Sequence, residues 1–200
     1  MADIYVRSTD GDNADSGATW ALAKATLAGA AAIDAAGDNI YLSQSHSEST
    51  AGAVTIALAG TNANPVKVIC GNDGAEPPTA VASTALVKST TTGTMITQGA
   101  AYFKGITFEC STGAVNGVFS VNATVSGLVQ VYEDCNLSNL ATASGATINI
   151  GASGASNADP NKTILKNCGI KVSATGAAVI LFGELQWIGG SLLSGTAPTT

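Results

Sequence analysis

Four segments in the second half of the chain share one six-residue pattern. Each begins with a large apolar residue, has Gly, Asp or Asn at its third position, a small or apolar residue at its fourth and an apolar residue at its sixth. The segments span residues 103–108, 132–137, 165–170 and, more loosely, 187–192, so their starts are 29, 33 and 22 residues apart. A recurring unit with variable insertions predicts a solenoid of stacked parallel β-strands.

The third position of the pattern holds Gly105, Asp134, Asn167 and Gly189. These residue types tolerate a left-handed backbone, which a sharp bend between two short strands requires. The apolar residues on either side of each bend would then point inward and form columns of equivalent side chains. One column would contain Phe103, Tyr132, Leu165 and Trp187, another Phe108, Leu137, Ile170 and Leu192, and Cys135 on Cys168 would form an interior ladder.

The N-terminal region carries helix signals as well as short strand-like runs. Thr19 can cap a helix over residues 20–35 that ends before Gly37. An apolar stripe recurs on this helix at helical spacing, formed by Trp20, Ala23, Leu27, Ala30 and Ala31. We therefore expect one continuous domain, with a strand and a capping helix in residues 1–43 and parallel β-coils in residues 44–200.

Composition limits the functions that such a chain can have. Charged residues make up 11% of the chain and hydrophobic residues 46%, which excludes a disordered acidic tail and argues against a coiled coil. The formal net charge is -6 and Arg7 is the single arginine, so we set aside nucleic acids and anionic membranes as partners. The four cysteines lack the spacing of metal or redox motifs, so we expect free, buried thiols.

Residues 17–27 and 37–42 carry a family resemblance. The run Trp20-Ala-Leu-Ala-Lys-Ala-Thr-Leu27, followed by an Ala-rich segment and by Gly37-Asp-Asn-Ile-Tyr-Leu42, resembles the opening of pectate-lyase-like proteins. The resemblance is specific over residues 3–43 and extends as a pattern over the remainder. It implies an all-β, right-handed parallel β-helix whose N-terminal α-helix closes the apolar end of the solenoid. Short β-coils rich in Ala, Thr and Gly also resemble virion proteins of tailed bacteriophages.

Catalytic candidates are few. Enzymes of the resembled superfamily act in a groove along one sheet face, and glycoside hydrolases need paired carboxylates roughly 5–10 Å apart. Glu109 and Glu133 could approach each other on adjacent coils, which makes them the best candidates for such a pair. The alternative is that both are solvated edge charges that keep the sheet soluble.

Metal and cofactor motifs are weaker still. Asp10, Asp12 and Asp15 resemble part of a calcium loop, but Asp15 and Ala21 stand where an EF-hand needs Gly and Glu. The alternative is a turn whose acids favour the start of the following helix. His46 has no second His or Cys at metal spacing, so we expect an exposed loop residue. We expect no cofactor, because no dinucleotide or phosphate-binding motif stands between a strand and a helix.

The C-terminal end of the predicted stack lacks a cover. Residues 187–193 form the last coil, and residues 194–200 contain no second capping helix. An uncovered coil would expose interior side chains and unpaired backbone groups. We expect a partner chain, a symmetry mate or further polypeptide to cover it.

The leading functional hypothesis is a non-enzymatic structural protein of a tailed-phage virion. Within that class we favour a trimeric capsid decoration or cement protein on the head surface, with the major capsid protein or other virion proteins as partners. The N-terminus lacks the basic and apolar regions of a signal peptide, so we expect assembly in the host cytoplasm. Alternatives are a tail fibre or spike component, a polysaccharide lyase or hydrolase, and a carbohydrate-binding module.

Overall fold

The computed structural model describes residues 1–90, 93–110, 117–123, 127–143, 145–151, 160–173 and 177–194. Within these residues the protein is nearly all-β, and its strands form parallel sheets of eleven and five members. The prediction of an all-β chain built from parallel strands is therefore confirmed at this level. No helix in the described ranges has the length and apolarity needed to cross a membrane.

The larger sheet consists of two parallel ladders that merge in one long strand. The first ladder contains β1 (Asp3–Val6), β2 (Asn39–Ser43), β5 (Val66–Gly71), β8 (Ala101–Lys104) and β11 (Val129–Glu133). The second contains β3 (Ser47–Ala51), β6 (Ala85–Thr90), β9 (Ile106–Cys110) and β12 (Asn136–Asn139). Strand β14 (Lys162–Val172) continues both ladders, and β16 (Glu184–Ser194) pairs with β14 along both halves.

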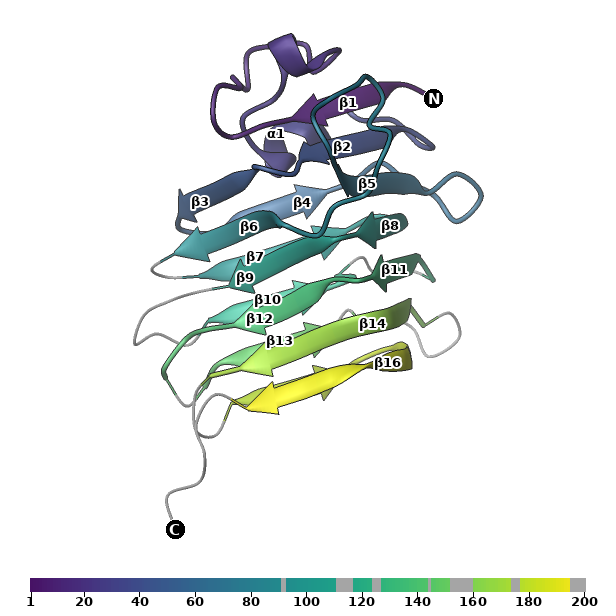
Figure 1. The fold of residues 1–200 in the computed structure, drawn as a ribbon. Coiled ribbons are helices and arrows are strands. Elements are labelled where there is room, and N and C mark those ends of the chain that lie inside the picture. The colour runs from purple at the N-terminus through teal and green to yellow at the C-terminus, as the bar shows by residue number, and fades with distance from the viewer. Residues whose placement is uncertain are drawn as a thin grey trace.

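The smaller sheet forms the third ladder. It contains β4 (Val54–Ala57), β7 (Thr94–Gln98), β10 (Val118–Val121), β13 (Thr147–Ile150) and β15 (Ala178–Leu181). Along the chain the strands visit the first, second and third ladders in a fixed order, and we call each such passage a tier. Figure 1 shows successive tiers from the purple N-terminal end to the yellow β16.

The bend between the first and second ladders is left-handed in successive tiers. The backbone φ angles are 73° at Gly105, 54° at Asp134, 52° at Asn167 and 71° at Gly189. This confirms the conformation predicted for the third position of the repeat. Gly105 has a second constraint, because a Cβ atom there would lie 2.0 Å from the backbone oxygen of Ala82.

The register places the proposed columns in line. Tyr132 pairs with Phe103 on one side and with Leu165 on the other, and Leu165 pairs with Trp187. The rings of Phe103 and Tyr132 stack with their centroids 4.7 Å apart. Across the bend, the second column runs in register through Phe108, Leu137, Ile170 and Leu192. Both columns are buried up to β14, and the side chains become exposed in β16.

The prediction of a single helix over residues 20–35 is wrong. The structure has a 3-10 helix, η1 (Trp20–Leu22), and a five-residue helix, α1 (Leu27–Ala31), with extended backbone at Ala23 and Thr26 between them. Thr19 makes no capping hydrogen bond, whereas the Thr26 hydroxyl accepts one from the Gly29 amide at 3.0 Å.

The edge of β1 explains the interruption. The Lys24 amide donates to the Tyr5 oxygen at 2.9 Å, and the Arg7 amide donates to the Lys24 oxygen at 2.9 Å. Residues 23–26 therefore satisfy backbone groups that β1 would otherwise leave unpaired, which outweighs the helix propensity of an Ala-rich segment. Leu27 and Ala30 of α1 are still buried against the core.

Candidate functional site

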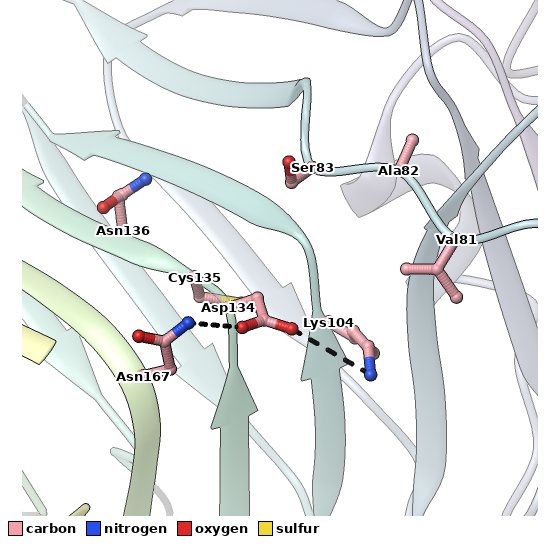
Figure 2. Close-up of a pocket in the computed structure, with 8 residues that line it drawn as sticks. All are labelled: Val81, Ala82, Ser83, Lys104, Asp134, Cys135, Asn136 and Asn167. Carbon is pink, nitrogen blue, oxygen red and sulfur yellow. Dashed lines mark hydrogen bonds and ion pairs between the residues drawn. The ribbon is translucent and has the colours of Figure 1, made fainter. Parts of the chain in front are cut away.

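A polar cavity of about 540 Å³ opens beside the left-handed bends. Three of its lining residues, Val81, Ala82 and Ser83, come from the connection between β5 and β6. The others come from the bends of three tiers, as Figure 2 shows: Lys104, Asp134, Cys135, Asn136 and Asn167. The bend thus brings an ammonium, a carboxylate and two amides from distant parts of the sequence to one wall.

Charges in this wall are mutually compensated. Figure 2 shows Asp134 between Lys104 and Asn167. The side-chain amide of Asn167 donates to the Asp134 carboxylate at 2.7 Å, and Lys104 Nζ lies 4.0 Å from the same carboxylate. Lys104 Nζ also donates to Glu133 at 2.6 Å. This hydrogen bond raises the pKa of Lys104 and lowers the pKa of Glu133, so both are ionised near neutral pH. An ionised Glu133 cannot serve as a general acid.

The two acids proposed as a catalytic pair are not brought together. Glu133 ends β11 in the first ladder, opposite Lys104 and Lys166. Glu109 lies across the bend in the second ladder, opposite Ser138, and its carboxylate is 3.1 Å from Lys88 Nζ. Each acid is neutralised by a lysine of a neighbouring tier, which corresponds to the alternative of edge charges in the sheet face.

Two of the three acids of the N-terminal loop, Asp10 and Asp12, accept hydrogen bonds from the protein. Asp10 accepts from the Arg7 guanidinium at 2.5 and 2.8 Å. Asp12 accepts from the Ala14 amide at 2.9 Å, and the Asp15 amide donates to the Asp12 backbone oxygen at 3.0 Å. These contacts close the turn. The described residues contain no group of three or more His, Cys, Asp or Glu side chains that could hold a metal ion.

The expectation of an exposed His46 is wrong. Its side chain is fully buried, with Nε2 3.3 Å from a carboxylate oxygen of Glu48, itself buried. The same oxygen accepts from the Leu27 amide at 2.8 Å, at the start of α1. Strand β3 is the first strand of the second ladder, and α1 packs on β1 and β4, the first strands of the other two ladders. The local polar sequence around His46 contains no signal of its burial.

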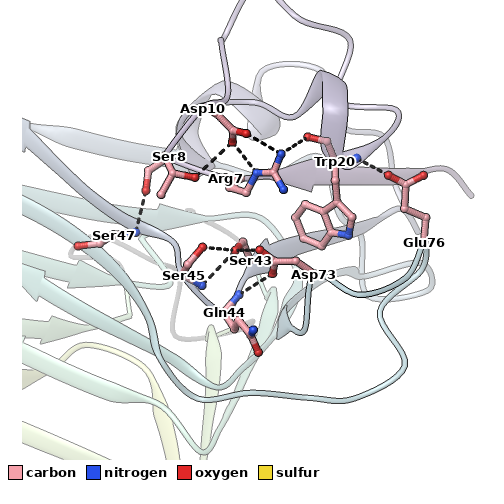
Figure 3. A network of polar contacts seen from close by, with 11 residues as sticks. Arg7, Ser8, Asp10, Trp20, Ser43, Gln44, Ser45, Ser47, Asp73 and Glu76 are labelled. Atoms are coloured by element: carbon pink, nitrogen blue, oxygen red, sulfur yellow. Dashed lines mark hydrogen bonds and ion pairs between the residues drawn. The ribbon is translucent and has the colours of Figure 1, made fainter.

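The connection between β5 and β6 also ties down the N-terminal cap, as Figure 3 shows. The Trp20 amide donates to the Glu76 carboxylate at 2.5 Å, and the Trp20 indole donates to the Ala75 oxygen at 3.0 Å. Asp73 accepts from the Ser43 hydroxyl at 2.6 Å. One segment therefore lines the polar cavity and also contacts the cap.

The opposite end of the stack is apolar and exposed. Trp187 is 37% exposed and Leu192 59%, although the residues paired with them in β14, Leu165 and Ile170, are buried. In β15, Leu181 is 53% exposed, whereas its partner Ile150 is buried. Within the described residues no strand pairs with the far edge of β16. The exposure comes from position at the end of the stack, because the same columns are covered in every earlier tier.

Comparison of the chain with protein-family models, curated proteins and solved structures produced no match. Three features of the molecule therefore carry the functional argument. They are a cap held by long-range hydrogen bonds, a polar cavity whose charged groups are paired, and an apolar end surface. We define the end surface as Leu181, Phe182, Trp187, Ile188 and Leu192.

Proposed function

We propose that the protein is a non-enzymatic structural component of a tailed-phage virion, a decoration protein whose end surface docks on the capsid shell. The end surface is the observation that carries this proposal. Each large apolar side chain left in water forfeits about 1.5–3 kcal/mol of burial free energy. Large exposed groups of apolar side chains mark interaction surfaces.

We infer further that the three ladders are the faces of a right-handed parallel β-helix. Three findings support this inference: the fixed order in which the chain visits the ladders, the left-handed bend in successive tiers, and the short helices over the first tier. A stack of this kind is stiff, because every tier is hydrogen-bonded to the next. A stiff protein suits a decoration role, because it can bind the capsid surface without deforming.

The assignment to a phage depends on the resemblance of the short β-coils, rich in Ala, Thr and Gly, to virion proteins. In this proposal the major capsid protein meets the end surface, and the chain assembles as a trimer. A location in the tail fibre or spike would use the same surface on a different partner. The ion-paired states of Glu109 and Glu133 support a structural role over hydrolysis.

The polar cavity favours a second candidate function, the binding of a carbohydrate. Its wall presents the side-chain amides of Asn136 and Asn167, the hydroxyl of Ser83 and the side chains of Lys104 and Asp134. Saccharide hydroxyls pair well with such a mixture of donors and acceptors. This candidate lacks an aromatic platform in the cavity lining, which favours the structural role as the leading proposal.

Electron cryomicroscopy of particles that carry this protein tests the proposal. We expect repeated density of its size on the head shell, contacted through the end surface. Density only on the tail would assign it to the fibre or spike, and absence from the particle would overturn the virion role. Cleavage of a host surface polysaccharide by the purified protein would overturn the non-enzymatic assignment.

A pair of variants tests the docking surface itself. Leu192→Asp puts a carboxylate in the end surface, whereas Val81→Asp changes an apolar side chain of similar exposure in the connection between β5 and β6. We expect Leu192→Asp to weaken binding to purified heads at least about tenfold, and Val81→Asp to leave it unchanged. Equal binding by both variants would contradict the assignment of the surface.

A further inference from the structure

Two buried thiols from consecutive tiers occupy equivalent positions beside the polar cavity. Cys135 follows the bend residue Asp134, and Cys168 follows the bend residue Asn167. The next residues, Asn136 and Gly169, pair in register, and the Gly169 amide donates to the Cys135 backbone oxygen at 3.0 Å. Cys135 is 1% exposed and Cys168 is fully buried. The two side chains are therefore neighbours in one interior column.

The spacing of this column suits a covalent bond between the sulfur atoms. Adjacent strands lie about 4.8 Å apart, within the roughly 4.4–6.8 Å range of Cα separations in disulfides, and the Cβ atoms must approach to about 3.5–4.5 Å when the bond forms. On the other side of Cys168 the column continues with Gly190, which has no side chain to block a change in the Cys168 rotamer. The remaining cysteines stand elsewhere, with Cys70 opposite Leu42 and Cys110 opposite Asn139.

The two thiols differ in their surroundings. A hydrogen bond from the Cys135 thiol lowers the pKa of Cys168, whereas burial raises the pKa of Cys135. Cys135 Sγ lies 3.3 Å from the Glu133 backbone oxygen, and Cys168 Sγ lies 3.3 Å from the backbone oxygen of Tyr132 in the preceding tier. The lowered pKa favours Cys168 as the thiolate of the pair, whereas the cavity lining places Cys135 nearer to solvent.

We propose that Cys135 and Cys168 form an oxidation-responsive pair that a small peroxide converts into a disulfide between consecutive tiers. The polar cavity, whose lining includes Cys135 and Lys104 but not Cys168, leads the peroxide to Cys135, and Cys168 is the next position of the column. The proposal does not depend on the virion role. It assigns the polar cavity as the access route for the oxidant.

The chemistry needs only hydrogen peroxide and the two thiols. The Cys168 thiolate attacks one peroxide oxygen, the O–O bond breaks, and the departing hydroxide takes a proton to leave as water. This step oxidises Cys168 to a sulfenic acid. The Cys135 sulfur then attacks the Cys168 sulfur, the S–O bond breaks, and the second oxygen leaves as water with the Cys135 proton. Two thiols and one peroxide give one disulfide and two waters.

The disulfide would link the tier of β11 and β12 to the tier of β14. Such a link restricts the unfolded chain between positions 135 and 168 and stabilises the folded stack. We expect the midpoint of thermal unfolding to rise by roughly 5–10 °C on oxidation and to return on treatment with dithiothreitol.

The test treats the full chain with hydrogen peroxide and counts thiols after unfolding. We expect the count to fall from four to two, and a non-reducing digest to contain one peptide linked through Cys135 and Cys168. A Cys70→Ala/Cys110→Ala double variant should behave like the unmodified chain in this digest. Cys168→Ala should form no internal disulfide.

The digest needs no variant, so the proposal stays testable if a substitution prevents folding. Retention of all four thiols after peroxide treatment would overturn it. A disulfide that involves Cys70 or Cys110 would do the same. Oxidation of either thiol to a sulfinic acid without a linked peptide would show that the sulfur atoms cannot reach each other, and would also reject the pair.

Discussion

The backbone amide of Trp20 donates a hydrogen bond to the Glu76 carboxylate, which lies 56 positions further along the chain. The bond joins the 3-10 helix of the cap to the connection between β5 and β6. Figure 1 shows that connection, coloured teal, running across β1 and β2. The cap is therefore held from outside as well as by its own packing on the core.

Replacing Glu76 should loosen the cap. In Glu76→Ala the Trp20 amide loses its acceptor, and we expect the free energy of unfolding in urea to fall by about 1–3 kcal/mol. Glu184→Ala is the matched control, because the Glu184 side chain is 58% exposed and pairs with Lys162 across 3.5 Å. An exposed pair contributes only about 0–1 kcal/mol. Equal losses in the two variants would show that the connection between β5 and β6 does not stabilise the cap.

Gly105 should tolerate no side chain. Gly105→Ala meets both a left-handed backbone and the Ala82 oxygen, so we expect a loss of about 3 kcal/mol or more. Gly52→Ala shares the positive φ, at 103°, but a Cβ there has no neighbour within 4 Å. The control should lose only about 1–2 kcal/mol. If chemical denaturation gives the same loss for both variants, close approach of the connection at Ala82 is not what selects glycine.

The hydroxyl of Tyr132 belongs to a buried hydrogen-bond network. It donates to Gln130 Oε1 at 2.7 Å and lies 2.9 Å from the Thr97 hydroxyl. Tyr132→Phe keeps the ring in its column but leaves these polar groups with fewer partners, so we expect a loss of about 1–3 kcal/mol. Calorimetry of the variant beside Tyr41→Phe, whose ring is only partly buried, measures the difference. A loss near zero would mean that water replaces the hydroxyl.

The ion pair between Lys104 and Glu133 should make stability depend on acid. Because the hydrogen bond from Lys104 lowers the pKa of Glu133 below its usual 4.5, the folded state binds this proton less readily than the unfolded state. The resulting stabilisation is fully present above the pKa that Glu133 has in the unfolded chain. It is lost as the pH falls through the lower pKa of Glu133 in the folded state.

Lys104→Met should therefore flatten the decline in unfolding free energy below about pH 4.5 relative to the unmodified chain. Lys171→Met removes an exposed lysine of β14 and serves as the control for net charge. Urea titrations from neutral pH to about pH 3 cover the window in which Glu133 takes up its proton. Parallel curves for the two variants would contradict the role of the pair.

Some of the architecture could be predicted from local chemistry alone. Asp134 and Asn167 stand at positions where only a few residue types accept a left-handed backbone, so their identity indicates the bend directly. The positions of Phe103, Tyr132 and Leu165 likewise indicate one column, because each residue lies two positions before the residue that forms a bend. These signals lie within a few residues of the feature that they predict.

Other features could not be predicted because they depend on residues distant in sequence. His46 has a polar sequence around it, yet its side chain is fully buried, and its partner Glu48 accepts a hydrogen bond from the Leu27 amide at the start of α1. Glu109 and Glu133 looked like a pair on adjacent coils, but the register across the bend gives each its own lysine. No local pattern contains that register.

The sequence by itself determined the all-β composition, the left-handed bends and the inward columns, since backbone sterics and apolar periodicity act over short distances. Tertiary structure alone decided where the Ala-rich segment stops being helical, because the edge of β1 needs hydrogen-bond partners at Lys24. It also decided which acids are neutralised and which columns end in solvent at Trp187 and Leu192. Those outcomes depend on which tier lies next to which, and each tier brings together residues that are about 20–40 positions apart in the sequence.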